Sequence, residues 1–133
     1  MSEAPDKPTI LVVEDERTIA SIISAMLSAE GYCCDIVATG EEAVDVALKA
    51  HPALILMDIK LRGQIDGIAA CEQIRACADI PILFISAYRD KKIVDLALQC
   101  GPSGYIEKPF KFRQLINEVK KTLKGKKQSL SLG

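Results

Sequence analysis

The sequence predicts a doubly wound α/β fold, in which helices cover both faces of a five-stranded parallel sheet. The chain has 133 residues, a length that suits one domain with one hydrophobic core. Apolar residues make up 49% and charged residues 26%, which are ordinary values for a globular domain. Five short apolar runs alternate with five segments of helical periodicity, and this order favours parallel strands joined by crossover helices.

The first half of the chain contains two predicted strands and two predicted helices. Residues 9–13 (TILVV) form a continuous β-branched run, which is typical of a strand buried on both faces. The next segment has the apolar spacing of an amphipathic helix, and Gly31 follows it at the position where glycine commonly ends a helix. Residues 32–38 (YCCDIVA) are the second strand, and Thr39 leads into a second helix with an apolar face.

The second half continues the alternation. We expect three further strands, at residues 53–57, 80–86 and 103–107. We expect helices at Gly67–Cys77 and Lys91–Gln99, and a last helix with an apolar stripe of Phe112, Leu115, Ile116, Val119 and Leu123. We find no internal repeat and no long linker, so the prediction is one domain over residues 9–124, between a flexible leader (1–8) and a flexible basic and polar tail (125–133).

Polar side chains follow or end four of the five predicted strands. Glu14 and Asp15 follow the first strand, Asp58 ends the third, Ser86 ends the fourth, and the fifth leads into Lys108. Ligands of open parallel sheets bind outside the carboxyl ends of the strands, where the strand order reverses. We therefore expect these five side chains to meet at one edge of the sheet.

The chemistry of these groups suits phosphoryl transfer. Asp58 lies in the apolar run ALILMDIKL, where a bare charge costs several kcal/mol or more unless it is paired or binds a metal. Carboxylates without histidine or thiolate neighbours suit Mg²⁺, with Mn²⁺ as the alternative ion, and Glu14 and Asp15 would hold it directly or through water. Asp58 can act as the nucleophile, while Ser86 and Lys108 bind phosphoryl oxygens.

Four short motifs resemble those of the response-regulator receiver domains, the phospho-accepting half of two-component and phosphorelay signalling. They are LVVEDE, LILMDI, LFISAY and GYIEKPF, and the resemblance runs from about Thr9 to Leu123. It implies a flavodoxin-like (βα)5 fold with strand order 2-1-3-4-5. It also implies a signalling phospho-acceptor that is not an enzyme, since it catalyses only its own phosphorylation and dephosphorylation.

The resemblance implies a role for each site residue. Asp58 would become a 4-aspartylphosphate, with a histidine kinase or a histidine phosphotransfer protein as the donor. Asp15, Asp58 and the backbone carbonyl of Lys60 would ligate Mg²⁺, while Glu14 acts mainly through water.

Further implications concern the switch and the output. Ser86 and Tyr105 would form a switch pair, in which the hydroxyl moves toward the phosphate and the ring turns inward. Lys108 would pair with the phosphoryl group, and the Lys108–Pro109 peptide bond would be cis. The downstream protein target would dock on the face of the fourth helix, fifth strand and fifth helix.

The chain also departs from the common family pattern. The acidic pair is Glu14-Asp15 in place of Asp-Asp, Ser86 replaces the more usual threonine, and the loop IKLRGQIDG is longer, with Gly63 where a proline is often found. Lys60 and Tyr88 lie two residues past Asp58 and Ser86 and flank the path of an attacking water. Because both side chains are large, we predict slow self-dephosphorylation.

Other interpretations of the same residues stay open. Asp58 can be a structural strand-end carboxylate, Glu14-Asp15 can cap the following helix, Ser86 can cap a turn, and Lys108 can be a solvated charge. At the level of function, the alternatives are a receiver-like interaction module that is never phosphorylated and a Mg²⁺-dependent phosphatase that forms an aspartyl-phosphate. Such phosphatases typically carry a second aspartate two residues after the nucleophile, where this chain has Lys60.

Composition bounds the partners and the location. The formal net charge of −1 gives no reason to expect direct binding of nucleic acid or of a membrane surface. The five cysteines have no C-x-x-C spacing, and we interpret them as reduced packing residues. We expect a cytoplasmic protein, a monomer or a phosphorylation-dependent dimer. Because only a short tail follows Leu123, we expect a stand-alone receiver that acts by docking to partners.

Overall fold

A computed structural model of the chain describes residues 7–132, with side chains up to residue 125. Its elements alternate along the whole chain: β1 (Thr9–Val13), α1 (Arg17–Ala29), β2 (Cys33–Val37), α2 (Gly40–Ala50), β3 (Leu54–Asp58), α3 (Gly67–Cys77), β4 (Ile82–Ser86), α4 (Lys91–Gln99), β5 (Gly104–Glu107) and α5 (Phe112–Leu132). All neighbouring strands are parallel, and their order is β2-β1-β3-β4-β5. The predicted (βα)5 fold and strand order are confirmed.

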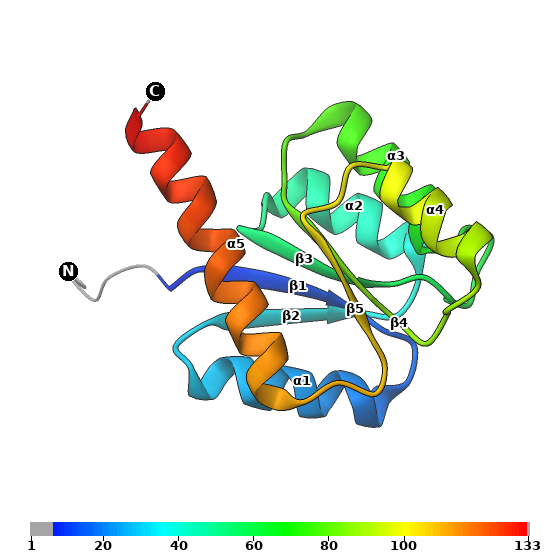
Figure 1. The fold of residues 1–133 in the computed structure, drawn as a ribbon, viewed down its shortest axis with the longest axis horizontal. Helices are drawn as coiled ribbons and strands as arrows, with labels where there is room; N and C mark the ends of the chain where they lie inside the picture. The colour runs from blue at the N-terminus through cyan, green and yellow to red at the C-terminus, as the bar shows by residue number, and fades with distance from the viewer. Residues whose placement is uncertain (1–6, 133) are drawn as a thin grey trace.

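The helices form two layers around the sheet (Figure 1). Helices α1 and α5 pack on one face, where Ile23 and Leu27 of α1 and Leu115 and Val119 of α5 join the apolar core. Helices α2, α3 and α4 cover the other face, with small side chains such as Ala97 next to the sheet. Burial of apolar area on both faces stabilises the fold and leaves the sheet's carboxyl edge between the layers.

Burial explains the sequence pattern of the strands. Every residue of β3 and β4 is buried, as continuous apolar runs predict, whereas the edge strand β2 is partly exposed. In the parallel register Val13 pairs with Met57, and Asp58 pairs with Ile85. Residues that follow β1 therefore lie beside the end of β3, and Ser86 extends one residue past the level of Asp58.

Local turn chemistry fixes several helix ends. Gly31 has a φ of +95° just after α1, a conformation that favours glycine. Thr39 caps α2, since its side chain accepts a hydrogen bond of 3.1 Å from the Glu42 N–H, and Glu42 accepts one from Ala38. At the other end of α2, His51 adopts a left-handed conformation with a φ of 48°. The sequence did not indicate this, because glycine or asparagine usually occupies such a position.

Three expectations concern the ends of the chain and its cysteines. Helix α5 continues to Leu132, so residues 125–132 are helical backbone where a separate tail was expected. Residues 1–6 of the expected leader lie outside the described residues. All five cysteines carry free thiols, but the packing interpretation is wrong for Cys33 and Cys77, which are exposed. Within residues 7–132 we find no helix with the length and apolar character of a membrane span.

Candidate functional site

Three polar side chains are buried at the carboxyl edge of the sheet. Glu14 is 4% exposed, Asp58 7% and Ser86 1%. A buried polar or charged group is stable only where it has a partner. Within the described part of the chain, every fully buried side-chain nitrogen or oxygen atom has a hydrogen-bond partner. The partners at this edge therefore define the site.

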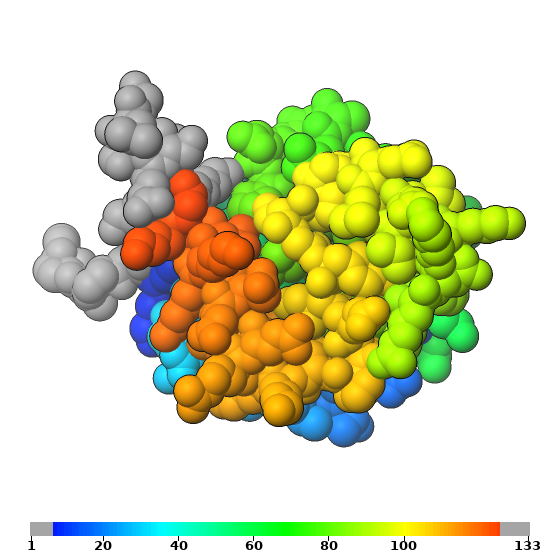
Figure 2. Space-filling model, viewed as in Figure 1, coloured from blue at the N-terminus to red at the C-terminus, as the bar shows by residue number. Residues whose placement is uncertain are grey.

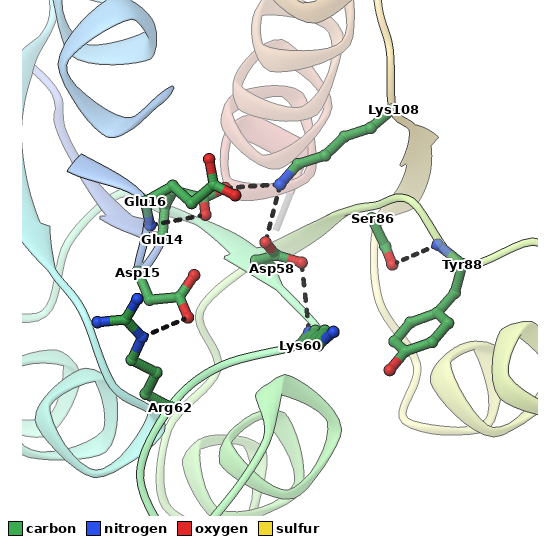
Figure 3. A network of polar contacts seen from close by, with 9 residues as sticks. All are labelled: Glu14, Asp15, Glu16, Asp58, Lys60, Arg62, Ser86, Tyr88 and Lys108. Carbon is green, nitrogen blue, oxygen red and sulfur yellow. Dashed lines mark hydrogen bonds and ion pairs between the residues drawn. The ribbon is translucent and has the colours of Figure 1, made fainter. Parts of the chain in front are cut away.

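Lys108 is the partner of both buried carboxylates (Figure 3). Its Nζ lies 2.7 Å from Oε1 of Glu14 and 2.8 Å from Oδ2 of Asp58. Burial alone would lower the pKa of Lys108, but the hydrogen bonds and charges of Asp58 and Glu14 outweigh burial and raise it. The ammonium group thus stays charged and compensates a carboxylate that lies at the end of an apolar strand.

Glu14 lies in an environment that disfavours its charged form. Burial raises its pKa, the hydrogen bond from Lys108 opposes that shift, and the nearby charge of Asp58 adds to it, with a net upward result. Its second oxygen, Oε2, accepts a hydrogen bond of 3.1 Å from the Glu16 N–H. Glu14 is therefore fixed from two sides and faces Asp58 across the Lys108 ammonium group.

A third carboxylate completes a group that can hold a metal ion. Glu14, Asp15 and Asp58 each offer one oxygen, and these oxygens all lie within 4.8 Å of one another. An all-oxygen donor set with several carboxylates suits a hard divalent cation such as Mg²⁺, which keeps part of its water shell. The group lines an open cavity of about 650 Å³, which leaves room for those waters. The residues present fit the ion.

Ser86 and Tyr105 are linked through the backbone of Tyr88. The Ser86 Oγ accepts a hydrogen bond of 3.0 Å from the Tyr88 N–H, and the Tyr105 hydroxyl donates one of 2.9 Å to the Tyr88 carbonyl. The half-buried Tyr105 ring packs at 50° against Phe84 of β4, with ring centroids 6.3 Å apart. The hydroxyl beside Asp58 and the tyrosine of β5 therefore contact the same residue, from two sides.

The loop after β3 brings further groups to the site. The Lys60 N–H donates a hydrogen bond of 3.3 Å to Oδ1 of Asp58. Arg62 places its Nε 3.7 Å from Oδ2 of Asp15. The loop ends at Gly67, where an added Cβ would overlap the Asp58 carbonyl oxygen, so only glycine fits this close backbone approach.

A clamp outside the cavity holds this loop. The Glu41 carboxylate on α2 accepts a hydrogen bond of 2.9 Å from the Gln64 N–H, and this bond lowers the pKa of Glu41. The contacts of Arg62 and Glu41 were not predicted. Their only sequence signal was the unusual length of the loop, which gives no register for long-range pairs.

The structure brings together the residues that the strand-end rule selected. Glu14, Asp15, Asp58, Ser86 and Lys108 all line the one cavity. Two further candidates, Lys60 and Tyr88, line it too, and Tyr105 is hydrogen-bonded to the Tyr88 carbonyl. The Lys108–Pro109 peptide bond is cis.

Two alternative interpretations can now be judged from geometry. The N-cap residue of α1, Glu16, makes no capping hydrogen bond with its own side chain, but its N–H donates to Oε2 of Glu14, so Glu14 supports the start of the helix as well as lining the cavity. Lys108 is paired and mostly buried, so the interpretation as a solvated charge is wrong. Ser86 does fix a turn through Tyr88, a role that leaves its hydroxyl at the cavity.

An open parallel sheet with an acidic group, a lysine and a hydroxyl at its carboxyl edge is the arrangement that the resemblance to receiver domains predicts. The family model described as "Response regulator receiver domain" matches residues 10–120 of the chain. The chain belongs to this family.

Solved structures agree with the family assignment. The signal receiver domain of a modulated diguanylate cyclase from Desulfovibrio desulfuricans has a TM-score of 0.85 and 32% identity, over 93% of this chain and 99% of that one. A CheY-like receiver domain protein from Methanospirillum hungatei has a TM-score of 0.87 and 26% identity, over 93% and 99%. The BeF3-activated N-terminal receiver domain of RstA from Klebsiella pneumoniae has a TM-score of 0.81 and 28% identity, over 86% and 97%.

Proposed function

We propose that Asp58 accepts a phosphoryl group from a phosphohistidine and that the modified domain switches the binding of a partner protein. One observation carries the proposal: the Lys108 ammonium group lies 2.8 Å from a buried aspartate that has two further carboxylates within 4.8 Å. A structural ion pair needs only one carboxylate. The two extra carboxylates are explained if a cation and a phosphoryl group bind beside Asp58.

In the proposed step an Asp58 oxygen attacks phosphorus, the O–P bond forms, and the N–P bond to the donor histidine breaks. Lys108 is placed to pair with a phosphoryl oxygen, because its Nζ already contacts Oδ2 of Asp58. Glu14, Asp15 and Asp58, with the Lys60 carbonyl, would hold Mg²⁺, which neutralises phosphoryl charge when bound. The Lys60 N–H holds Oδ1 of Asp58 and so orients the nucleophile.

The switch would run through Tyr88. If the Ser86 hydroxyl moves to a phosphoryl oxygen, it gives up its 3.0 Å contact with the Tyr88 N–H. The Tyr88 carbonyl accepts from Tyr105, so a shift of this peptide changes the support of the Tyr105 ring. The phosphoryl group would then bias two arrangements of the same backbone, as a population shift requires.

The output surface would be formed by α4, β5 and α5. Figure 2 shows these segments side by side on the face toward the viewer. Leu96 and Leu98 of α4 are 52% and 51% exposed, and Phe112 of α5 is 41% exposed. These side chains do not form one patch, since Leu96 lines a hollow with Ile68 of α3 and Phe112 lines one with Glu30. The choice of this face therefore rests on the resemblance to the receiver family. The phosphodonor would be a histidine kinase or a histidine phosphotransfer protein.

The lifetime of the phosphorylated state would depend on the residues at the cavity mouth. Lys60 and Tyr88 both line the cavity beside Asp58. Large side chains at these positions restrict the approach of water to the phosphorus atom, so we expect slow self-dephosphorylation. Replacing both residues with alanine should shorten the lifetime; an unchanged hydrolysis rate would contradict this role.

Intact-mass measurement after incubation with acetyl phosphate tests the proposal. We expect a gain of one phosphoryl group that needs Mg²⁺ and disappears in Asp58→Asn. The matched control is Asp45→Asn, which removes an exposed carboxylate on α2 that pairs only with Lys49 among the contacts of the described chain. It should be phosphorylated like the wild type.

A negative result with acetyl phosphate must be repeated with a protein phosphodonor. No gain with acetyl phosphate, followed by no gain with a phosphorylated histidine phosphotransfer domain, would contradict the proposal. It would favour the alternative of an interaction module that is never phosphorylated.

A further inference from the structure

A cation on the loop after β3 contacts one of the three site carboxylates. The Arg62 Nε lies 3.7 Å from Oδ2 of Asp15, and in Figure 3 the Asp15 carboxylate lies between the Arg62 guanidinium group and Asp58. The Arg62 side chain is 82% exposed, whereas that of Asp15 is 18% exposed. The contact therefore lies at the mouth of the cavity, which both residues line.

Contacts with the start of α2 hold the backbone of this loop, so the position of the Arg62 backbone is fixed. Arg62 forms an isolated bridge with Thr39, just before α2. Glu41 accepts a hydrogen bond from the Gln64 N–H at 2.9 Å. Gly63 has a φ of +100°, and an added Cβ there would lie 2.7 Å from Oε1 of Glu41. The loop is thus clamped to the N-terminus of α2, and the guanidinium group reaches Asp15 from that clamp.

A guanidinium group at this position opposes a divalent cation. Both would use the Asp15 carboxylate, and two positive charges on one carboxylate repel each other. We propose that Arg62 competes with the metal ion for Asp15 and thereby sets the Mg²⁺ affinity of the phosphoryl-acceptor site. This inference rests on the proposed function of that site. At a separation of about 6 Å in a solvent-exposed position, one unit charge changes the affinity for a divalent ion by about three- to tenfold.

The Mg²⁺ dependence of the thermal unfolding midpoint tests this, because an ion that binds the folded state raises the midpoint by mass action. At low ionic strength Arg62→Gln should bind Mg²⁺ about three- to tenfold more tightly than the wild type. Arg62→Lys, which keeps the charge, should stay close to the wild type. Lys49→Gln removes the same charge from an exposed position on α2 and should leave the affinity unchanged. The gain in Arg62→Gln should shrink in about 0.5 M salt.

Other outcomes separate this inference from the proposed function. If Arg62→Gln binds Mg²⁺ no more tightly than the wild type, while Asp15→Asn loses binding, the metal site stands and the role of Arg62 is wrong. If the wild type itself shows no Mg²⁺-dependent midpoint, the metal assignment of the proposed function fails, and the inference fails with it.

Discussion

Replacing Lys108 with methionine tests how much the ammonium group of Lys108 stabilises the fold by compensating the buried carboxylates of Glu14 and Asp58. Lys108 contacts Glu14 at 2.7 Å and Asp58 at 2.8 Å, and its side chain is only 18% exposed. Methionine keeps most of the apolar stem and removes the ammonium group. In Lys108→Met the carboxylates keep their burial but lose their common partner, so the folded state carries an uncompensated charge.

The size of the effect follows from the geometry. Two carboxylate oxygens of the group lie no more than 4.8 Å apart, a separation at which they repel each other by about 3.5 kcal/mol or more at an effective dielectric constant of about 20. Removing one partner of a fully buried ion pair costs about 3–5 kcal/mol, and the partial exposure of Lys108 reduces that. We expect Lys108→Met to lose about 2–3 kcal/mol of unfolding free energy at neutral pH without metal.

Urea unfolding at pH 7 in EDTA measures this loss. The raised pKa of Lys108 means that its contribution is fully present below its unfolded value of 10.5 and is lost as the pH rises through the folded value. The difference between variant and wild type should also shrink in acid, as Glu14, whose pKa is raised, takes up its proton. Mg²⁺ should stabilise the variant more than the wild type, because it replaces the missing cation.

The control is Lys91→Met, which breaks an exposed pair with Asp95 on α4. We expect a change within about 0.5 kcal/mol, since exposed pairs contribute little. If Lys108→Met were as stable as the wild type at pH 7 in EDTA, Asp58 would not depend on Lys108 for its charge. The account of the site as a compensated buried cluster would then be wrong.

Three further predictions concern the support of the site and the fold. Gly67→Ala should lose about 2–4 kcal/mol in urea unfolding, because its Cβ would overlap the Asp58 carbonyl, whereas Gly125→Ala, with open space around it, should lose nothing. His51→Gly should raise the free energy of unfolding by about 0.5 kcal/mol in the same assay, because glycine adopts the left-handed conformation of residue 51 without strain. The lowered pKa of Glu41 adds stability above its unfolded value of 4.5, which is lost as the pH falls through the folded value. The melting temperatures of wild type and Glu41→Gln should therefore converge in acid, and a constant difference would contradict this.

The sequence predicted the core of the site because topology does most of the placing. Parallel strands end at one edge, so the residues that end a strand or directly follow it meet there, and this places Asp58, Ser86 and Lys108 together. The same rule could not find Arg62 or Glu41, since neither lies at a strand end. Their partners are 47 and 23 residues away in the chain, and loop residues have no periodicity that fixes a register.

The differences in the fold have equally local causes. The end of α5 was predicted near Leu123 because the apolar stripe stops there, yet the polar residues beyond it are good helix formers without proline, and the helix continues to Leu132. At His51 the backbone takes the left-handed conformation although neither glycine nor asparagine is present. In both cases the pattern of side chains indicates which face of the helix is buried but does not determine the residue at which the helix ends.

Charge compensation links the proposed chemistry to these structural details. Two cations, Lys108 and Arg62, make the ion pairs of the three site carboxylates that the described chain shows. A phosphoryl group on Asp58 would replace one negative charge with about two, so the same cations would no longer suffice. The single positive charge of Lys108 would have to compensate both Glu14 and the phosphoryl group. Arg62 contacts only Asp15. Glu14, Asp15 and Asp58 would hold a divalent ion that supplies the missing positive charge, and Arg62 would then give up its contact with Asp15. The metal requirement and the role of Arg62 thus follow from one electrostatic argument: the intact-mass assay tests the metal requirement, and the Mg²⁺ dependence of the unfolding midpoint tests the role of Arg62.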